Sequence, residues 1–220
     1  KLLIKFEIIS DPICPWCYIA KTWLDRALEA FPEHNFNIQW KPFQLNPEMP
    51  SEGMPRLKYL EKKFGGRQRA IDAYKPIVEI SLANKINIDF ERIKTTPNTL
   101  DAQRLIYWAG IEGVQTRIVS GLFKAFFKDG KDIGNQETLI KVAENHGMNH
   151  EVVRKLLASA EDRAHIKNLD LSARKSGIKA VPMFIIDRKY AVSGAQKTEF
   201  WTGVFSEISQ KYKAADTYDL

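Results

Sequence analysis

Cysteine is scarce in this chain: only Cys14 and Cys17 occur among its 220 residues. Two cysteines so close together would close a loop too short to remove much unfolded-state entropy. They therefore do not indicate the disulfide-rich scaffold of small secreted domains. The chain also lacks an apolar run of about 18 residues, so we expect no membrane-spanning segment. It contains no internal repeat and no low-complexity linker, which argues against repeat arrays.

The charge balance is mildly basic, with 33 Lys and Arg residues against 27 Asp and Glu residues and a net charge of +6. The basic residues are spread along the chain in stretches such as KYLEKKFGGRQR and ARKSGIK. Such a spread is typical of solvated helix faces, whereas nucleic-acid and membrane surfaces concentrate their charge. We therefore expect no nucleic-acid partner and no membrane partner.

The N-terminal part has the pattern of a strand, a helix and a second strand. Residues 2–9 form an apolar run relieved only by Lys5 and Glu7, which predicts a largely buried strand. Apolar residues at spacings of three and four from Trp16 to Phe31 predict a helix that ends at Pro32. NFNIQWKPF then predicts another strand. Three such elements within about 40 residues have the length of a right-handed βαβ unit.

The remainder divides into a helical block and a short strand-rich segment. From about residue 54 to 175 nearly every stretch has helical periodicity, with N-cap residues expected at Thr99, Asn135 and Asn149. MFIID and YAVSG then flank a predicted hairpin turn at residues 187–189, and a last helix is expected from about residue 197 to 212. We therefore predict an α/β fold in three segments. Residues 1–53 (βαβ) and 166–220 (αββα) share one central sheet, and residues 54–165 form an all-helical insertion.

The cysteine pair is expected to lie at the start of the first helix. Pro15 would then occupy the first helical position, where its missing N–H costs nothing. The free N–H groups of the first turn and the helix dipole favour a thiolate at Cys14, and such thiols have a pKa of roughly 3.5 to 7. Cys17 would lie inside the first turn, on the same side but shielded from partners. We therefore predict that Cys14 is the nucleophile and Cys17 the resolving thiol of a redox pair.

A metal site is the competing interpretation of the pair. A structural zinc site needs four ligands, usually from two cysteine pairs or from one pair with two histidines. The chain has no second pair, and HGMNH, which holds two of its four histidines, has the composition of a helix break. We therefore expect no metal.

Together these motifs resemble the thioredoxin-fold DsbA family of oxidoreductases. The resemblance rests on ISDPICPWCYIAK after the first strand, WKPFQLNP after the second strand, and GIKAVPMFIID and YAVSGAQ near the end. It covers essentially the whole chain and is closest to the FrnE-like subgroup, which is related to 2-hydroxychromene-2-carboxylate isomerases and kappa-class glutathione transferases. It implies a thioredoxin fold, a mixed sheet flanked by helices with a large helical insertion. The implied activity is thiol–disulfide oxidoreduction on protein or small-molecule partners.

The resemblance also implies roles for residues around the pair. Val181-Pro182 would be the cis-proline loop that faces the cysteines, with the Val181 backbone available to a substrate strand. Pro15 and Trp16 would form part of an apolar landing surface, although Trp16 fits helix packing nearly as well. Glu7 matches a buried acid that could accept the proton of Cys17, but it lies one residue further from the cysteines than in the family and could instead pair with Lys5.

Another function class fits the same resemblance. A glutathione-dependent isomerase or transferase would act on an aromatic or polyketide-type molecule, but such relatives generally have a serine where Cys14 stands. A redox-inert binding module is less consistent with Pro15 and the helix start. We expect no cofactor besides the Cys14–Cys17 disulfide, glutathione as a candidate co-substrate, and a monomer or homodimer. The subgroup implies a cytoplasmic protein, while Lys1 in place of Met leaves a periplasmic or exported one open.

Overall fold

A mixed four-stranded sheet forms the centre of the molecule. The computed structural model describes residues 3–32 and 34–218, with side chains through residue 210. The strand order is β2-β1-β5-β6. Strand β1 (Leu3–Ser10) pairs parallel with β2 (Asn35–Pro42) and antiparallel with β5 (Met183–Ile186), which pairs antiparallel with β6 (Tyr190–Ser193). The N-terminal βαβ unit and the C-terminal hairpin therefore share one sheet, as the sequence predicts.

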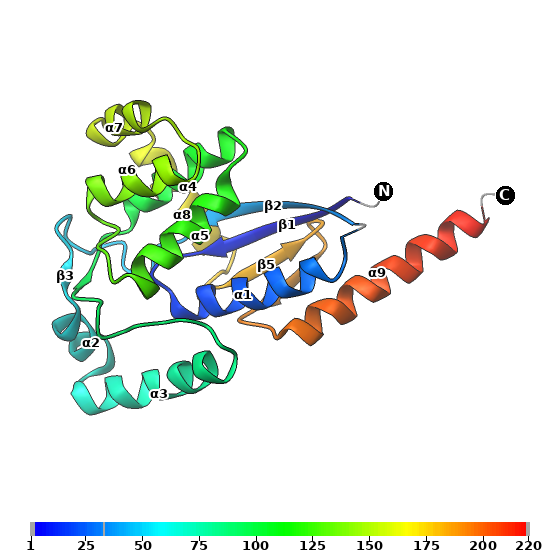
Figure 1. Cartoon of the computed structure of the whole chain (residues 1–220), viewed down its shortest axis with the longest axis horizontal. Helices are drawn as coiled ribbons and strands as arrows, with labels where there is room; N and C mark the ends of the chain where they lie inside the picture. The colour runs from blue at the N-terminus through cyan, green and yellow to red at the C-terminus, as the bar shows by residue number, and fades with distance from the viewer. Residues whose placement is uncertain (1–2, 33, 219–220) are drawn as a thin grey trace.

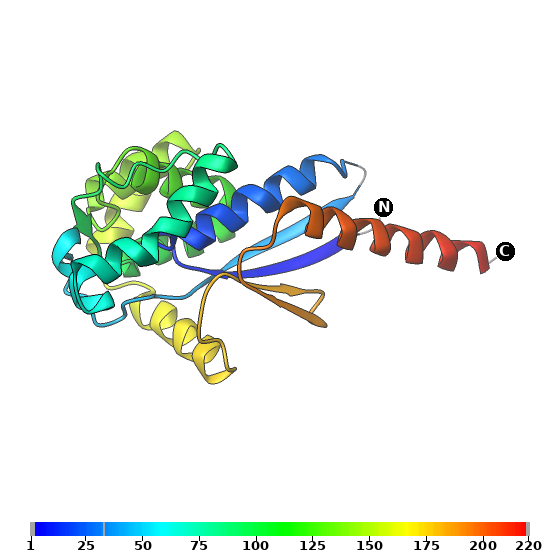
Figure 2. The ribbon, with the colours of Figure 1, turned by 90° about the horizontal axis from the view of Figure 1, so that it is seen from below.

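Two helices from opposite ends of the chain cover one face of this sheet. They are α1 (Pro15–Glu29) and α9 (Thr198–Tyr218), which lie side by side in Figures 1 and 2. The apolar residues of β1 point into this layer, where Phe6 is fully buried and its ring packs edge-on against Trp201 and Phe205. Burial of these large rings anchors α9 on the sheet, because apolar area removed from water is stabilising at about 25 cal/mol per Å².

The helical insertion gathers at the end of the sheet where β1 leads into α1 (Figure 1). Its elements are α2 (Arg56–Phe64), α3 (Arg67–Ala83), α4 (Leu100–Ile111), α5 (Gln115–Phe123), the π-helix η1 (Lys124–Lys128), α6 (Gln136–Asn145) and α7 (His150–Ala158). Helix α8 (Arg163–Lys175) follows the insertion and packs against β2 and α4. A two-stranded ribbon of β3 (Met54–Pro55) and β4 (Thr95–Thr96) ties the start of the insertion to its middle. Periodicity does not predict this ribbon, because two residues are too few to show alternation.

Local signals place several element ends correctly. The side chains of Asn135 and Asn149 cap α6 and α7 by accepting backbone N–H hydrogen bonds, whereas the hydroxyl of Thr99 makes no such bond to α4. The hairpin turn lies where it is expected, and Asp187 and Arg188 both have positive φ. Helix α9 continues to Tyr218, beyond the expected end near residue 212. None of the described helices is long and apolar enough to cross a membrane.

Helix α1 is held from two directions by the insertion. The Tyr18 ring stacks on Phe123 and Phe127, with centroids 5.3 and 5.4 Å away. Further along the helix, the Trp23 indole donates a hydrogen bond to Asn84 at the end of α3. The sheet and the insertion thus share one packed interior around the helix that carries the cysteines.

Candidate active site

Cys14 is the N-cap residue of α1. Its backbone is extended (φ −82°, ψ 116°), Pro15 is the first helical residue, and the Cys14 carbonyl accepts hydrogen bonds from the Cys17 N–H at 3.1 Å and the Tyr18 N–H at 3.2 Å. The backbone N–H groups of the first turn therefore point towards this end of the helix, where negative charge is stabilised. Only 4% of Cys14 is exposed, and its thiol donates a long 3.7 Å hydrogen bond to the Val181 carbonyl.

Cys17 lies one turn into the helix and is more deeply buried, with 1% of the residue exposed. Burial raises the pKa of its thiol well above the ordinary value, and the neighbouring Cys14 raises that pKa further. Hydrogen bonds from the Ser10 hydroxyl and the Asp11 N–H to the sulfur act in the opposite direction. Both cysteines are free thiols in the structure. At neutral pH Cys17 is therefore a protonated, shielded thiol, consistent with the resolving position.

The loop before β5 forms the other wall of the site. The Val181–Pro182 peptide bond is cis, and the Pro182 carbonyl accepts a hydrogen bond from the Gly194 N–H at 2.9 Å. This bond attaches the loop to the end of β6, beside β5. The sheet thus brings together two segments that lie far apart in the sequence, because β5 pairs directly with β1.

Asp11 is a buried carboxylate that the sequence analysis missed. It is fully buried, and its two oxygens accept hydrogen bonds from the N–H groups of Ile13 (3.3 Å) and Leu45 (2.7 Å). Burial raises the pKa of Asp11 to about 7, although these bonds and the Thr99 hydroxyl oppose the rise. Asp11 therefore joins the cysteine loop to the segment after β2, while its own N–H contacts the Cys17 sulfur. One feature of the sequence could have indicated its role: Asp11 is an acidic residue directly after the predicted buried strand and three residues before Cys14.

The insertion brings a cation to the same corner of the molecule. The ammonium of Lys63, in α2, donates to the Tyr59 hydroxyl at 3.0 Å, and that hydroxyl donates to Asn46 Oδ1 at 3.1 Å. Burial alone would lower the pKa of Lys63, but the hydrogen bond to Tyr59 and charge interactions with Tyr59, Tyr74 and Cys14 raise it. The same ammonium favours the ionised form of Asp11.

The remaining residues that the sequence predicts at the site are Pro15, Trp16 and Glu7. Pro15 is buried, and half-buried Trp16 packs against both hydrophobic clusters, which fits its role in helix packing. The Glu7 carboxylate lies 4.0 Å from the Lys41 ammonium, and no described contact joins it to either cysteine. Neighbouring Phe6 enters the core cluster that contains the cysteines, so Glu7 points to the opposite face of β1. Its role in proton transfer stays a prediction.

Within residues 3–32 and 34–218, no group of three or more His, Cys, Asp or Glu side chains could hold a metal ion. The described chemistry around Cys14 is therefore that of two thiols, a buried carboxyl group, a backbone carbonyl and a nearby ammonium. Such a set is suited to making and breaking sulfur–sulfur bonds.

Solved structures with related architecture include three enzymes of similar length. A probable DsbA oxidoreductase from Streptomyces coelicolor is 28% identical, with a TM-score of 0.82 over 93% of this chain and 89% of that one. A 2-hydroxychromene-2-carboxylate isomerase (14% identity, TM-score 0.71) covers 96% of this chain and 98% of its own. The cytosolic disulfide reductase DsbM from Pseudomonas aeruginosa, solved with GSH (14% identity, TM-score 0.67), covers 94% and 99%.

The two structures with lower identity show that the fold is shared, with its helical insertion and central mixed sheet. The sequence comparison is more specific, because the DSBA-like thioredoxin domain matches residues 6–205, almost the whole length of the chain. The protein therefore belongs to the DSBA-like thioredoxin domain family.

Proposed function

We propose that this protein is a thiol–disulfide oxidoreductase in which Cys14 meets the partner and Cys17 resolves the mixed disulfide. The observation that carries this proposal is the asymmetry of the pair. Cys14 caps α1 and faces the Val181 carbonyl, whereas Cys17 is deeper and its thiol has a raised pKa. Both thiols are buried in the reduced protein, so their positions at the helix cap and one turn into the helix assign the two roles of a sequential exchange.

The reaction of the reduced protein proceeds in two exchanges. The Cys14 thiolate attacks one sulfur of a partner disulfide, which forms a mixed disulfide and releases the other partner sulfur as a thiolate. Cys17 then loses its proton and attacks the Cys14 sulfur, which forms the Cys14–Cys17 bond and releases the second partner thiolate. The partner gains two electrons and the pair loses two. The reverse sequence oxidises a partner dithiol.

The segment around Val181 supports a role in holding the partner. Its carbonyl faces Cys14 at 3.7 Å, and Pro182 keeps this loop against the end of the sheet. An extended partner segment could hydrogen-bond to the Val181 backbone while its sulfur reacts with Cys14. Pro15 and Trp16 would supply the apolar border of this contact.

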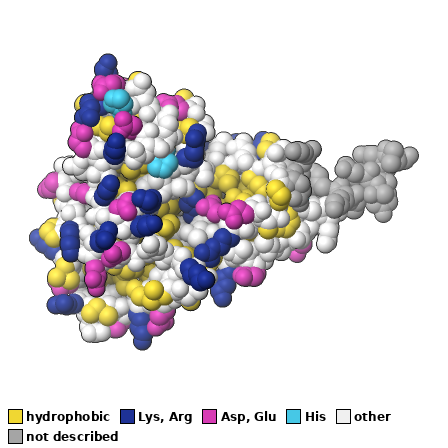
Figure 3. All heavy atoms as spheres, in the orientation of Figure 1, with side chains coloured by type: hydrophobic (Ala, Val, Ile, Leu, Met, Phe, Trp, Pro, Cys, Tyr) yellow, Lys and Arg dark blue, Asp and Glu magenta, His cyan; other side chains and the backbone are white. Residues whose placement is uncertain are grey.

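The proposed partners are protein disulfides and low-molecular-weight thiols, glutathione among them, and the proposed compartment is the cytoplasm. A cytosolic disulfide reductase solved with GSH shares the fold, which supports both parts of this proposal. On the face drawn in Figure 3, Lys and Arg side chains are scattered among Asp and Glu side chains. This distribution fits thiol partners better than a nucleic acid.

Trapping of mixed disulfides tests the proposed roles. Reduced Cys17→Ser and Cys14→Ser variants are incubated with insulin or glutathione disulfide, quenched with acid and analysed by intact mass. We expect Cys17→Ser to accumulate a partner adduct on Cys14, and Cys14→Ser to accumulate at least tenfold less, because Cys17 is shielded. Equal trapping by both variants would contradict the assignment. No trapping together with an inactive wild type would instead favour a glutathione-dependent isomerase.

A further inference from the structure

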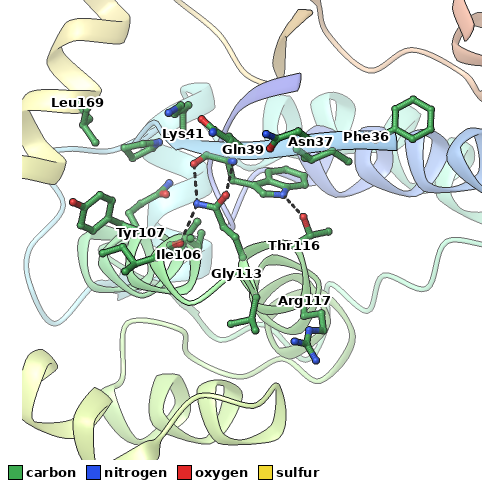
Figure 4. Close-up of a pocket in the computed structure, with 18 of the residues that line it drawn as sticks. Phe36, Asn37, Gln39, Lys41, Ile106, Tyr107, Gly113, Thr116, Arg117 and Leu169 are labelled. Carbon is green, nitrogen blue, oxygen red and sulfur yellow. Dashed lines mark hydrogen bonds between the residues drawn. The ribbon is translucent and has the colours of Figure 1, made fainter. Parts of the chain in front are cut away.

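The outer edge of β2 borders an open groove that the cysteine chemistry does not use. Strand β2 is paired with β1 on one side, and no strand lies on its other side in the part of the chain that the structure describes. The groove there has a volume of about 740 Å³ and is lined by β2, α4, α5 and two residues of α8 (Figure 4). This volume lies within the range of roughly 300–1,000 Å³ that is typical of ligand-binding sites.

Gln115 already occupies one position along this edge in the manner of a neighbouring strand. Its Oε1 atom accepts a hydrogen bond from the Trp40 N–H at 2.8 Å, and its Nε2 group donates to the Trp40 carbonyl at 3.2 Å (Figure 4). A residue in an antiparallel strand makes the same pair of bonds with the residue opposite. The backbone of Trp40 therefore points away from β1 and towards the groove.

The alternation of a strand places two more residues in the same orientation. Successive backbone groups of a strand point to opposite sides, so Phe36 and Ile38 direct their N–H and C=O groups outward with Trp40. Phe43, which has the opposite parity, bonds back to the Ser10 carbonyl of β1, in agreement with this register. Phe36 and Ile38 both line the groove. The N–H and C=O groups of two residues, Phe36 and Ile38, therefore continue this edge beyond Gln115.

The side chains that line the groove define the chemistry of an occupant. Lys41 and Arg117 are its Lys and Arg residues, His165 adds a titratable group, and the lining contains no Asp or Glu. Figure 4 shows Lys41 on the Leu169 side of β2 and Arg117 on the opposite side. The remaining wall includes apolar residues, of which Ile111 is 72% exposed. The groove thus has one cation at each border, of which Lys41 lies 4.0 Å from the Glu7 carboxylate just outside the lining, and it is partly apolar between them.

We propose that this groove binds an extended, acidic polypeptide segment, which adds to the free edge of β2 as a further strand beside Gln115. The added backbone would bond to Phe36 and Ile38, as in other cases of strand addition. Its side chains would alternate between the face of β2 that carries Lys41 and the face that carries Arg117. Binding involves neither Cys14 nor Cys17, so it is independent of the proposed redox function.

A peptide titration tests this proposal in a Cys14→Ser/Cys17→Ser chain, which excludes mixed disulfides. The probe is acetyl-VEVDV-amide, and backbone ¹⁵N–¹H spectra report on each residue. We expect the largest changes at the amides of Phe36 and Ile38. The double variant Lys41→Glu/Arg117→Glu should weaken peptide binding at least tenfold, because each substitution places a carboxylate against the acidic peptide. Lys128→Glu, a charge reversal outside the groove, should leave the affinity within twofold.

Two altered peptides separate strand addition from other forms of binding. N-methylation of alternate residues removes the N–H groups that would pair with β2, and we expect it to weaken binding at least tenfold. Replacement of both acids by lysine should do the same. The proposal is overturned if the methylated or the basic peptide binds as well as the probe, or if no peptide shifts Phe36 and Ile38. It is also overturned if these amides shift with protein concentration alone, which would identify a second copy as the occupant.

Discussion

Asp11→Asn is expected to remove a large pH dependence from the free energy of unfolding. Burial raises the pKa of Asp11 to about 7 in the folded protein, against an ordinary value of 3.8. Between these values the unfolded chain has lost this proton and the folded chain has kept it, so stability falls as the pH rises. At about 1.4 kcal/mol per pKa unit, the loss attributable to Asp11 is ~4 kcal/mol.

The measurement is urea unfolding of wild type and variant from about pH 4 to pH 8, compared as a difference at each pH. We expect the free energy of unfolding of Asp11→Asn, relative to that of wild type, to rise by ~4 kcal/mol from the low end of this pH range to the high end. This change does not depend on the absolute difference between the two proteins. The absolute value includes the loss of one acceptor for the N–H groups of Ile13 or Leu45.

A surface carboxylate serves as the control for the direction of the pH dependence. Arg154 lowers the pKa of Glu137 below its ordinary value of 4.5, so the difference for Glu137→Gln should change in the opposite direction, and only at the acid end of this range. A difference for Asp11→Asn that does not vary with pH would contradict the buried, protonatable carboxyl group described here.

Arg104→Met is expected to cost about 3–5 kcal/mol of stability, as removal of a buried charged partner does. The Arg104 side chain is completely buried in α4. It donates to Asp101 and to backbone carbonyls at the end of α7 and in the loop before α8, namely those of Leu156, Leu157, Ser159 and Glu161. The variant leaves these carbonyls and the Asp101 carboxylate without their buried donor, and each loss is destabilising.

Arg163→Met is the matched control, because Arg163 contacts the same Asp101 carboxylate from the surface. Its side chain is 40% exposed, so we expect its removal to cost less than about 1 kcal/mol. Urea unfolding of both variants measures the two costs. Similar losses for Arg104→Met and Arg163→Met would show that the carbonyl contacts of Arg104 contribute little.

The features that were predictable from the sequence depend on short-range patterns. Pro15 directly after Cys14 sets the helix start, the alternation in NFNIQWKPF sets β2, and the turn residues 187–189 set the hairpin. Each pattern reflects a local backbone preference or a face that must be buried. The meeting of Val181 with Cys14, in contrast, was expected only from the family resemblance.

The parts that the sequence did not reveal depend on contacts between distant segments. Asp11 is contacted by Leu45 and Thr99, and Lys63 of α2 comes close enough to interact with both Asp11 and Cys14. Glu7 was expected in a buried role because it matches a buried acid of the family that the sequence resembles. Its register in β1, however, places it opposite Gln39, with its carboxylate near Lys41 on the other face of the sheet. No local pattern contains these contacts.

The central claim is that Cys14 and Cys17 form one reversible redox couple, entered by a partner through Cys14. Equilibration of the protein in glutathione buffers of graded composition, followed by acid quench and intact mass, tests it most directly. We expect one two-electron transition, from the dithiol to an internal disulfide lighter by two hydrogen atoms. In Cys17→Ser it should be replaced by a single glutathione adduct on Cys14. A wild-type chain that stays reduced throughout, or that carries glutathione on both cysteines and never closes the disulfide, would contradict the claim.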